Sequence, residues 1–419
     1  MRHYRPHKQN SALIIFLIVS IAALMAIIVV LLFREPEVKV ETREVVKIVE
    51  KVVPPPLPSP FVPYKEVSIA ELFNGISIQT KAEFNQGGSA TKEVADKNSF
   101  VAEFKVRVNV PVATNTLAGL VELNPNLPKI IPALPDLLAT GKVSGFYHKM
   151  YEEKTKLVSR DFTHLHKVLD RHNFFDLETV LELTHPTKSG KALWIQSDMD
   201  VVTDGTDGDR MPVMEDAIVK SSNYQPFTSY YWPKTTTNPN PLLPVWEAKV
   251  KKFEDELKTK PAAARAKELK GAIEEKKSGI ADMKTKSWLL GEKDPFVVIP
   301  LSMLNYSADK FGPAIGDYVA VIHADKIYPA IIGDAGPREK IGEGSLFLAK
   351  HLSAKANSYN RPEDALKVTY IVFPGSADKP RAAPDLKKWH DRVQSLLEGI
   401  GGLGEGVTLV EFEDPFAVK

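Results

Sequence analysis

The segment formed by residues 316–352 constrains the fold more than any other part of this chain. Its sequence is GDYVAVIHADKIYPAIIGDAGPREKIGEGSLFLAKHL. Two apolar runs rich in β-branched residues, 317–322 and 327–332, predict neighbouring strands joined by a short turn. Gly and Pro in the stretch 333–337 predict a tight, exposed loop, and Ser345 is expected to begin an amphipathic helix. The segment therefore predicts a hairpin, a loop and a helix start.

Asp334 and Glu343 flank this glycine-rich loop, and two carboxyl groups on a rigid framework are suited to acid/base chemistry. Hydrolysis of a sugar acetal with inversion needs one carboxylic acid that protonates the leaving oxygen. A second carboxylate must activate water on the opposite face, at a separation of about 6.5–9.5 Å. Two structural alternatives stay open: Asp334 as an ordinary turn residue, and Glu343 as a carboxylate at the helix N-terminus.

Residues 11–33 form an apolar stretch without a charge, SALIIFLIVSIAALMAIIVVLLF. As a helix, a stretch of this length crosses a hydrocarbon core of about 30 Å. A cleaved signal peptide would have a shorter apolar region followed by small residues. The preceding MRHYRPHKQN is basic, so residues 1–10 are expected in the cytoplasm and the chain after Arg34 outside it. We predict a single-pass signal-anchor whose partner is the lipid bilayer.

The rest of the chain divides into a stalk and one folded domain. Residues 34–64 mix charged residues with valine and then proline, which is typical of a stiff linker. Residues 65–419 form the domain, and apolar spacing within 246–285 predicts a helical hairpin inserted into a β-rich body. Other helices and strands are expected at 145–171 and 386–397, and at 104–110, 180–183, 191–196, 293–300 and 368–374.

Composition excludes several classes of function. The chain has no cysteine, which excludes disulfide bonds, thiolate metal sites and cysteine nucleophiles. Its ten histidines follow no metal-binding spacing, and no nucleotide-binding fingerprint or GxSxG motif occurs. The formal net charge of +1 gives no general reason to expect nucleic-acid binding. We therefore expect no metal, no cofactor and no nucleic-acid partner, and the oligomeric state stays open.

An acidic run and an aromatic loop supply candidate substrate-binding residues. Asp198 and Asp200 lie in SDMDVVTDGTDGDR at the end of a predicted strand, where they share one face. They are expected to bind a cationic sugar, with solvated loop acids as the alternative. Tyr230 and Trp232 belong to an aromatic, proline-rich loop, and Tyr328 lies on a predicted strand. Such rings stack on the apolar faces of sugars or anchor a loop to the core.

Four blocks of the sequence together resemble a known enzyme family. SDMDVVTDGTDG, KDPFVVIP, GDYVAVIHADKIYPAIIGDAGP and IGEGSLFLAKHL occur in this order between residues 194 and 352. They are similar to the blocks of the glycoside hydrolase family 75 chitosanases. The helical hairpin, the membrane anchor and the long N-terminal section depart from the compact fungal enzymes and resemble a bacterial branch of the family.

This resemblance implies an endo-acting glycoside hydrolase that cleaves β-1,4-linked glucosamine polymers with inversion. The family's catalytic Asp and Glu fall on Asp334 and Glu343, as general acid and general base in either order. The same stretch resembles a double-psi β-barrel, because GDAGP followed by IGEGS is similar to a pattern of septal-ring lipoproteins and membrane-bound lytic transglycosylases. The expected fold is therefore α+β, with a six-stranded double-psi β-barrel core, flanking helices and the inserted hairpin.

Two other functions stay open on these residues. The first is a peptidoglycan lytic enzyme built on the same barrel, with its acid/base at Asp334. The second is a non-catalytic glycan-binding or envelope scaffold protein that uses the hairpin at 246–285 as its contact. In every case the domain at 65–419 is expected on the periplasmic or extracellular side of the membrane.

Overall fold

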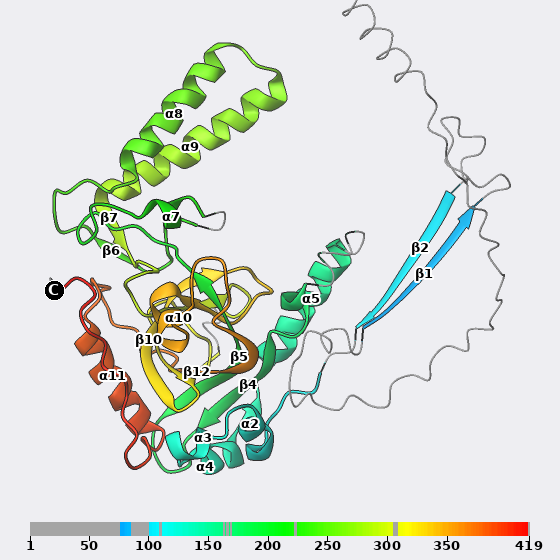
Figure 1. The fold of residues 1–419 in the computed structure, drawn as a ribbon, viewed down its shortest axis with the longest axis vertical. Helices are drawn as coiled ribbons and strands as arrows, with labels where there is room; N and C mark the ends of the chain where they lie inside the picture. The colour runs from blue at the N-terminus through cyan, green and yellow to red at the C-terminus, as the bar shows by residue number, and fades with distance from the viewer. Residues whose placement is uncertain are drawn as a thin grey trace, which may run out of the picture. The chain divides into compact units, whose positions relative to one another are not determined.

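The computed structural model describes residues 76–84, 100–108, 111–161, 164, 167, 170–221, 224–304 and 309–417 (Figure 1). The predicted membrane span at 11–33 and the predicted stalk at 34–64 lie outside the described residues. Among the helices that are described, none is both long enough and apolar enough to cross a bilayer.

A closed six-stranded β-barrel forms the core of the fold. Going around the barrel, the strands follow the order β11-β8-β10-β9-β12-β5, and a pairing between β5 and β11 closes it. Their bounds are β5 Lys191–Val202, β8 Phe296–Pro300, β9 Tyr318–His323, β10 Lys326–Gly336, β11 Glu343–Ser345 and β12 Glu363–Val372. The pairs β10–β8 and β11–β5 are parallel, and the other four are antiparallel. The predicted α+β fold with a six-stranded barrel is confirmed, and its double-psi type stays a prediction.

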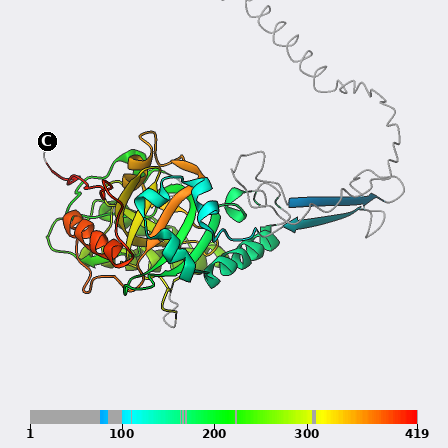
Figure 2. The ribbon, with the colours of Figure 1, turned by 90° about the horizontal axis from the view of Figure 1, so that it is seen from below.

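Alternating apolar residues on the strands explain how helices cover the barrel. On β9, Val319 and Val321 belong to one buried cluster, whereas Ala320 and Ile322 belong to another. The first cluster also contains residues of α5 (Gly145–Asp161) and α10 (Leu346–Leu352). The second contains residues of α11 (Leu386–Gly399), which packs on β9 and β10 along one side of the barrel (Figures 1 and 2).

Smaller elements extend this core. The strands β3 (Lys142–Val143) and β4 (Leu177–Thr184) continue the sheet beyond β5, and three short helices pack beside them. These helices are α2 Leu117–Leu123, α3 Leu127–Ile130 and α4 Leu134–Thr140. The remaining short elements are η1 Arg171–Asn173 and α7 Asp216–Val219. A separate antiparallel pair consists of β1 (Ile76–Phe84) and β2 (Phe100–Val108).

Two long helices, α8 (Leu243–Lys258) and α9 (Ala263–Thr285), form a hairpin in the region where the sequence predicts one. Figure 1 shows the hairpin extending away from the barrel. Ion pairs such as Lys277–Glu254 and Lys284–Glu247 join the two helices along their exposed faces. At its base, β6 (Tyr231–Pro233) pairs with β7 (Lys286–Trp288).

The prediction of an exposed loop at 333–337 is wrong, because strand β10 continues through Gly336. A Cβ atom on Gly333 would lie 2.5 Å from Leu289 Cδ1 and 2.6 Å from Phe296 Cβ. Glycine is required there by close packing rather than by a turn. The register with β8 shifts between Ile332 and Asp334, which marks a β-bulge that re-aims the following side chains.

The helix start expected at Ser345 is confirmed. Ser345 is the N-cap of α10, and its side chain accepts a hydrogen bond from the backbone N–H of Leu348. The helix predicted at 145–171 is shorter than expected, since α5 ends at Asp161 and its last buried residue is Val158.

Candidate active site

Asp334 lies just after the bulge of β10, where three hydrogen bonds fix its carboxylate. Its Oδ1 accepts from the backbone N–H of Ser229 at 2.9 Å, from Ser229 Oγ at 2.6 Å and from the N–H of Ala335 at 2.8 Å. Burial raises the pKa of Asp334, although these hydrogen bonds oppose the rise; the nearby charge of Glu343 adds to it. The residue is therefore a rigidly held carboxyl group that favours its protonated form more than an exposed Asp does.

Glu343 begins β11 and is only 7% exposed. Its Oε1 forms an ion pair with Lys340 Nζ at 2.5 Å. The N-cap of the following helix is Ser345, so Glu343 does not cap that helix. The helix-start alternative for this carboxylate is therefore wrong, and its negative charge is balanced by a lysine that lines the same cleft.

Closure of the barrel places the two predicted acids at the same level, on the strands that lie on either side of β8. Asp334 on β10 is in register with Val298 on β8, and Val298 is in register with Glu343 on β11. Glu343 is in turn aligned with Asp200 on β5. Two strand spacings separate the backbones of Asp334 and Glu343, which is about 10 Å. A Cβ atom on Gly336 would lie 2.9 Å from Glu343 Oε2, so the Glu343 side chain leans toward the strand that carries Asp334.

Both acids line a cleft of about 790 Å³, within the usual size range of ligand sites. Four carboxyl groups and two cationic side chains are among its lining residues: Asp200, Asp204, Asp334, Glu343, Lys340 and Arg361. Its other side chains include Gln225, Phe227, Leu301, Ser358, Tyr359 and Asn360. The cleft is thus acidic on balance, with a few apolar and aromatic surfaces on its walls.

Asp204 also lines the cleft. It belongs to the same acidic run as Asp198 and Asp200, but no role is predicted for it from the sequence. It follows the end of β5, and its Oδ1 accepts a hydrogen bond from the backbone N–H of Gln225 at 2.8 Å. Burial raises the pKa of Asp204 to about 7; the Gln225 hydrogen bond opposes this rise, and the charges of Asp334 and Glu343 add to it. The raised pKa results from burial and from carboxylates on other strands, which give no local signal in the sequence.

Asp200 lines the cleft as predicted, but basic groups already surround it. Its carboxylate lies 3.0 Å from Lys340 Nζ, 3.3 Å from Arg361 Nε and 3.0 Å from His172 Nε2. Burial opposes ionisation, yet these three partners hold the pKa of Asp200 well below its usual range. Lys340 therefore bridges two carboxylates, those of Asp200 and Glu343.

Asp198 has a different position from its predicted partner Asp200. It is fully buried and is not among the residues that line the cleft. Its backbone carbonyl accepts a hydrogen bond from Tyr370 Oη at 2.7 Å, and its carboxylate packs directly against Gly342. Gly342 has a φ of +79°, so both its conformation and this contact require glycine.

The three predicted substrate-binding aromatics lie away from the cleft. Tyr230, Trp232 and Tyr328 are all buried, at 6%, 2% and 2% exposure. The Tyr230 and Tyr328 hydroxyls donate to backbone carbonyls, and Arg210 lies 5.0 Å from the Trp232 ring centre. The aromatic residues on the cleft are Phe227 and the largely exposed Tyr359.

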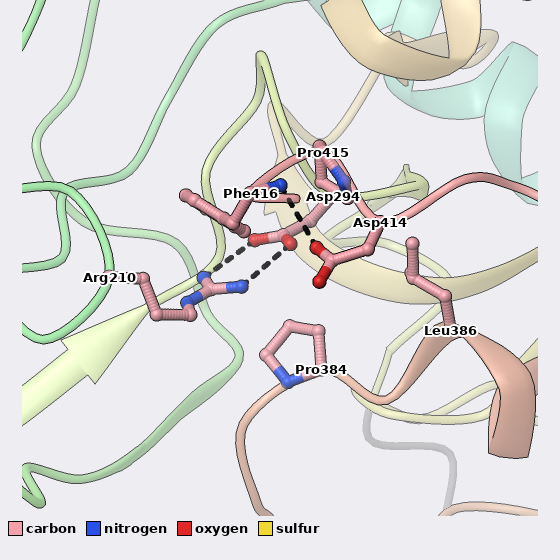
Figure 3. A pocket seen from close by; sticks show the side chains of 7 residues that line it. All are labelled: Arg210, Asp294, Pro384, Leu386, Asp414, Pro415 and Phe416. Carbon is pink, nitrogen blue, oxygen red and sulfur yellow. Dashed lines mark hydrogen bonds and ion pairs between the residues drawn. The ribbon is translucent and has the colours of Figure 1, made fainter. Parts of the chain in front are cut away.

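Other members of the acidic run stabilise the fold. Arg210 donates to both oxygens of Asp294 at 2.8 Å, beside a smaller pocket of about 300 Å³ (Figure 3). Its Nε also donates to Asp207 at 2.5 Å. Asp209 forms an ion pair with Lys234 at 2.8 Å. In the part of the chain that the structure describes, no cluster of three or more His, Asp or Glu residues could hold a metal ion.

Comparison with known proteins assigns a family to the region that contains the cleft. The family model described as fungal chitosanase of glycosyl hydrolase group 75 matches residues 199–408, which is half of the chain and includes most of the barrel and the cleft. No curated protein matches the chain. The family match confirms the resemblance seen in the four sequence blocks. The chain therefore belongs to glycosyl hydrolase group 75, the family of the fungal chitosanases, and is a glycoside hydrolase.

Proposed function

We propose that this protein is an endo-acting hydrolase of β-1,4-linked glucosamine polymers that inverts the anomeric configuration. The observation that carries the proposal is the alignment of Asp334 and Glu343 on either side of Val298, inside one acidic cleft. Backbones about 10 Å apart allow the two carboxyl groups to approach the separation of about 6.5–9.5 Å that inversion uses.

Asp334 is the general acid in this proposal. Its burial and raised pKa favour the protonated form, and the Ser229 hydrogen bonds hold the group in one orientation. The proton passes to the glycosidic oxygen while the bond between this oxygen and the anomeric carbon breaks. The leaving sugar therefore departs as a neutral alcohol.

Glu343 is the general base. Its ion pair with Lys340 balances a carboxylate charge at the cleft wall. The carboxylate takes a proton from a water molecule whose oxygen attacks the anomeric carbon from the face opposite to the leaving group. The new hydroxyl group then has the inverted configuration, and both carboxyl groups exchange protons with solvent to start again.

The cleft suggests how the amino groups of the substrate are bound. The charge of Asp200 is already shared with Lys340 and Arg361, whereas Asp204 has no cationic partner among its described contacts. We assign Asp204 as the principal ligand for a substrate ammonium group. The exposed ring of Tyr359 is the surface suited to stacking on sugars.

Reducing-end release from chitosan by the full-length chain tests this function. We expect cleavage into oligosaccharides by the wild-type protein and loss of at least 10³-fold with Asp334→Asn, since the variant cannot donate the proton. Anhydro products from purified cell walls, without any cleavage of chitosan, would instead establish a lytic enzyme. Glycan binding without turnover of either polymer would establish a scaffold.

We also propose that residues 11–33 anchor the protein in a membrane, with the hydrolase domain on the periplasmic or extracellular side. The support is the apolar stretch and the basic residues that precede it. Protease added to intact spheroplasts should degrade the domain and leave a reporter fused to residue 1 intact. Protection of the domain in intact cells would reverse the proposed orientation.

A further inference from the structure

One loop contributes hydrogen bonds to two of the carboxyl groups in the cleft. We call residues 224–230 the cleft-wall segment, because Gln225 and Phe227 line the cleft. The N–H of Gln225 donates to Asp204, and the N–H and hydroxyl of Ser229 donate to Asp334. The position of this segment therefore decides how both carboxyl groups are solvated.

Phe227, in the middle of the cleft-wall segment, packs against the base of the α8–α9 hairpin. Its ring centre lies 5.3 Å from that of Trp246 on α8, in an edge-to-face arrangement, and 4.7 Å from that of Trp288 on β7. Trp246 and Trp288 are buried, at 8% and 3% exposure. Aromatic pairs of this geometry stabilise a contact beyond the effect of their buried area.

Gly279 of α9 completes this contact. A Cβ atom there would overlap with Cζ3 of Trp246 and would lie 3.1 Å from Cζ of Phe227. The absence of a side chain on Gly279 therefore lets the two rings approach the helix. A helix normally disfavours glycine relative to alanine, so the position is determined by packing rather than by helix propensity.

We propose that the base of the α8–α9 hairpin positions the cleft-wall segment and, through it, sets the orientation and hydrogen bonding of Asp334 and Asp204. Phe227, Trp246 and Gly279 are positioning residues in this proposal, since they act through Ser229 and Gln225. The inference deepens the proposed glycan hydrolysis and rests on it for its catalytic consequence.

The direction of the effect on Asp334 follows from its hydrogen bonds. Burial is the dominant effect and raises the pKa of Asp334, while the Ser229 donors lower it, so their loss raises that pKa further as long as the carboxyl stays buried. The titratable and charged groups around it are Glu343 with its partner Lys340, Asp204, and Arg381, which donates to the Ser229 carbonyl. Lys340 pairs with Glu343, whereas Asp204 accepts a hydrogen bond from Gln225 of the segment itself. A general acid is active while protonated, so a raised pKa moves the alkaline limb of the pH–rate profile to higher pH.

A matched pair of glycines on α9 provides the test. Nothing lies within 4 Å of a Cβ atom on Gly271, eight positions before Gly279 in the same helix. Gly271→Ala and Gly279→Ala therefore add the same methyl group to one helix, and only the second reaches the cleft-wall contact. Full-length wild-type protein and both variants are compared for kcat and KM on chitosan across pH.

For Gly279→Ala we expect a loss in kcat of about 10- to 100-fold, with a smaller change in KM and an alkaline limb at higher pH. Gly271→Ala should keep the wild-type kcat and profile. Combining Gly279→Ala with Trp246→Phe, which shortens the obstructing ring, should restore part of the activity. Equal kcat and equal pH limbs in folded Gly271→Ala and Gly279→Ala proteins would overturn the inference.

A second readout separates this inference from the proposed function. Titration of the Asp334 carboxyl by ¹³C NMR should show a higher pKa in Gly279→Ala than in Gly271→Ala, whether or not chitosan is cleaved. If Gly279→Ala does not fold, Phe227→Leu is compared with wild type in the same titration, and an unchanged Asp334 pKa sinks the inference. Absence of cleavage by the wild-type protein refutes only the proposed function.

Discussion

Asp334 and Glu343 are in register with the same residue, Val298, from opposite sides of strand β8. One pairing is parallel and the other antiparallel, so the two acids come from segments that run in opposite directions past the same point. This arrangement allows residues that are neighbours in the sequence to face one cleft from separate strands. Two acids held on strands of a closed barrel need no flexible loop to bring them together.

Removing the Ser229 hydroxyl tests the acidity assigned to Asp334. Ser229→Ala loses the donor at 2.6 Å and keeps the backbone donor. Since this hydrogen bond lowers the pKa of Asp334, we expect the alkaline limb of kcat to move up by about half a pH unit to one unit. Measured kcat–pH profiles check this, with Ser358→Ala on another part of the cleft as the control. A limb that moves down would assign the acid to a different residue.

Azide distinguishes the base from the acid. In Glu343→Ala no carboxylate activates water, so we expect kcat to fall by about 10³-fold or more. Azide needs no deprotonation and fits the space left by the side chain, so it should restore turnover and give a glycosyl azide of inverted configuration. The same addition to Asp334→Ala should not restore cleavage of chitosan, because the leaving oxygen still lacks a proton donor. Rescue of Asp334→Ala alone would reverse the two roles.

Asp204 is expected to cost stability at alkaline pH. Its pKa in the folded protein is about 7, whereas an exposed Asp titrates near 3.9. The folded state therefore loses stability as pH rises from about 4 to about 7, and the full cost is present above pH 7. Asp204→Asn keeps an acceptor for the Gln225 N–H and removes the charge. We expect it to raise the free energy of unfolding at pH 8 by about 1–3 kcal/mol and to change little at pH 3.5.

Urea unfolding at the two pH values measures this difference for Asp204. An equal effect at both pH values would mean that burial does not perturb this carboxyl. If Asp204 binds substrate ammonium groups, the same variant should also raise KM for fully deacetylated chitosan more than for partly acetylated chitosan.

Asp200 should have the opposite dependence on pH. Its pKa is depressed by His172, Lys340 and Arg361 against the effect of burial, so its stabilisation is present above its ordinary pKa and is lost as pH falls. Asp200→Asn is therefore expected to lower the free energy of unfolding by about 1–3 kcal/mol at pH 7, where the cations lose their partner. The deficit should shrink as the pH falls below about 4. A deficit that stays constant down to pH 2 would show that packing, not charge, is responsible.

The local chemistry of the sequence predicted the elements of the barrel well. The strand pattern at 191–196 lies within β5, the pattern at 317–322 overlaps β9 from Tyr318 onward, and the helix cap at Ser345 is confirmed. Strand patterns and helix caps depend on residues that are close together in the chain, and such residues can be read directly from the sequence. The glycines at 333–336 were misleading, because close packing against Leu289 and turn formation favour the same residue type.

The site depends on contacts that the sequence does not display. An irregular loop has no period, so nothing in the sequence indicated that Phe227 faces the cleft while Tyr230 and Trp232 lie in the core. Strand parity placed Asp198 with Asp200, yet Asp198 is packed beneath Gly342. The raised pKa of Asp204 depends on burial and on residues of other elements, and it becomes visible only when the barrel has closed.

The anomeric configuration of the first product tests the central claim most directly. Proton NMR during cleavage of a chitosan oligosaccharide by the full-length protein records whether the new reducing end appears first as the α or the β anomer. The alignment of Asp334 and Glu343 across Val298 predicts the α anomer, formed by a single displacement at a β linkage. A β anomer appearing first, in a reaction that Asp334→Asn abolishes, would contradict the inverting arrangement.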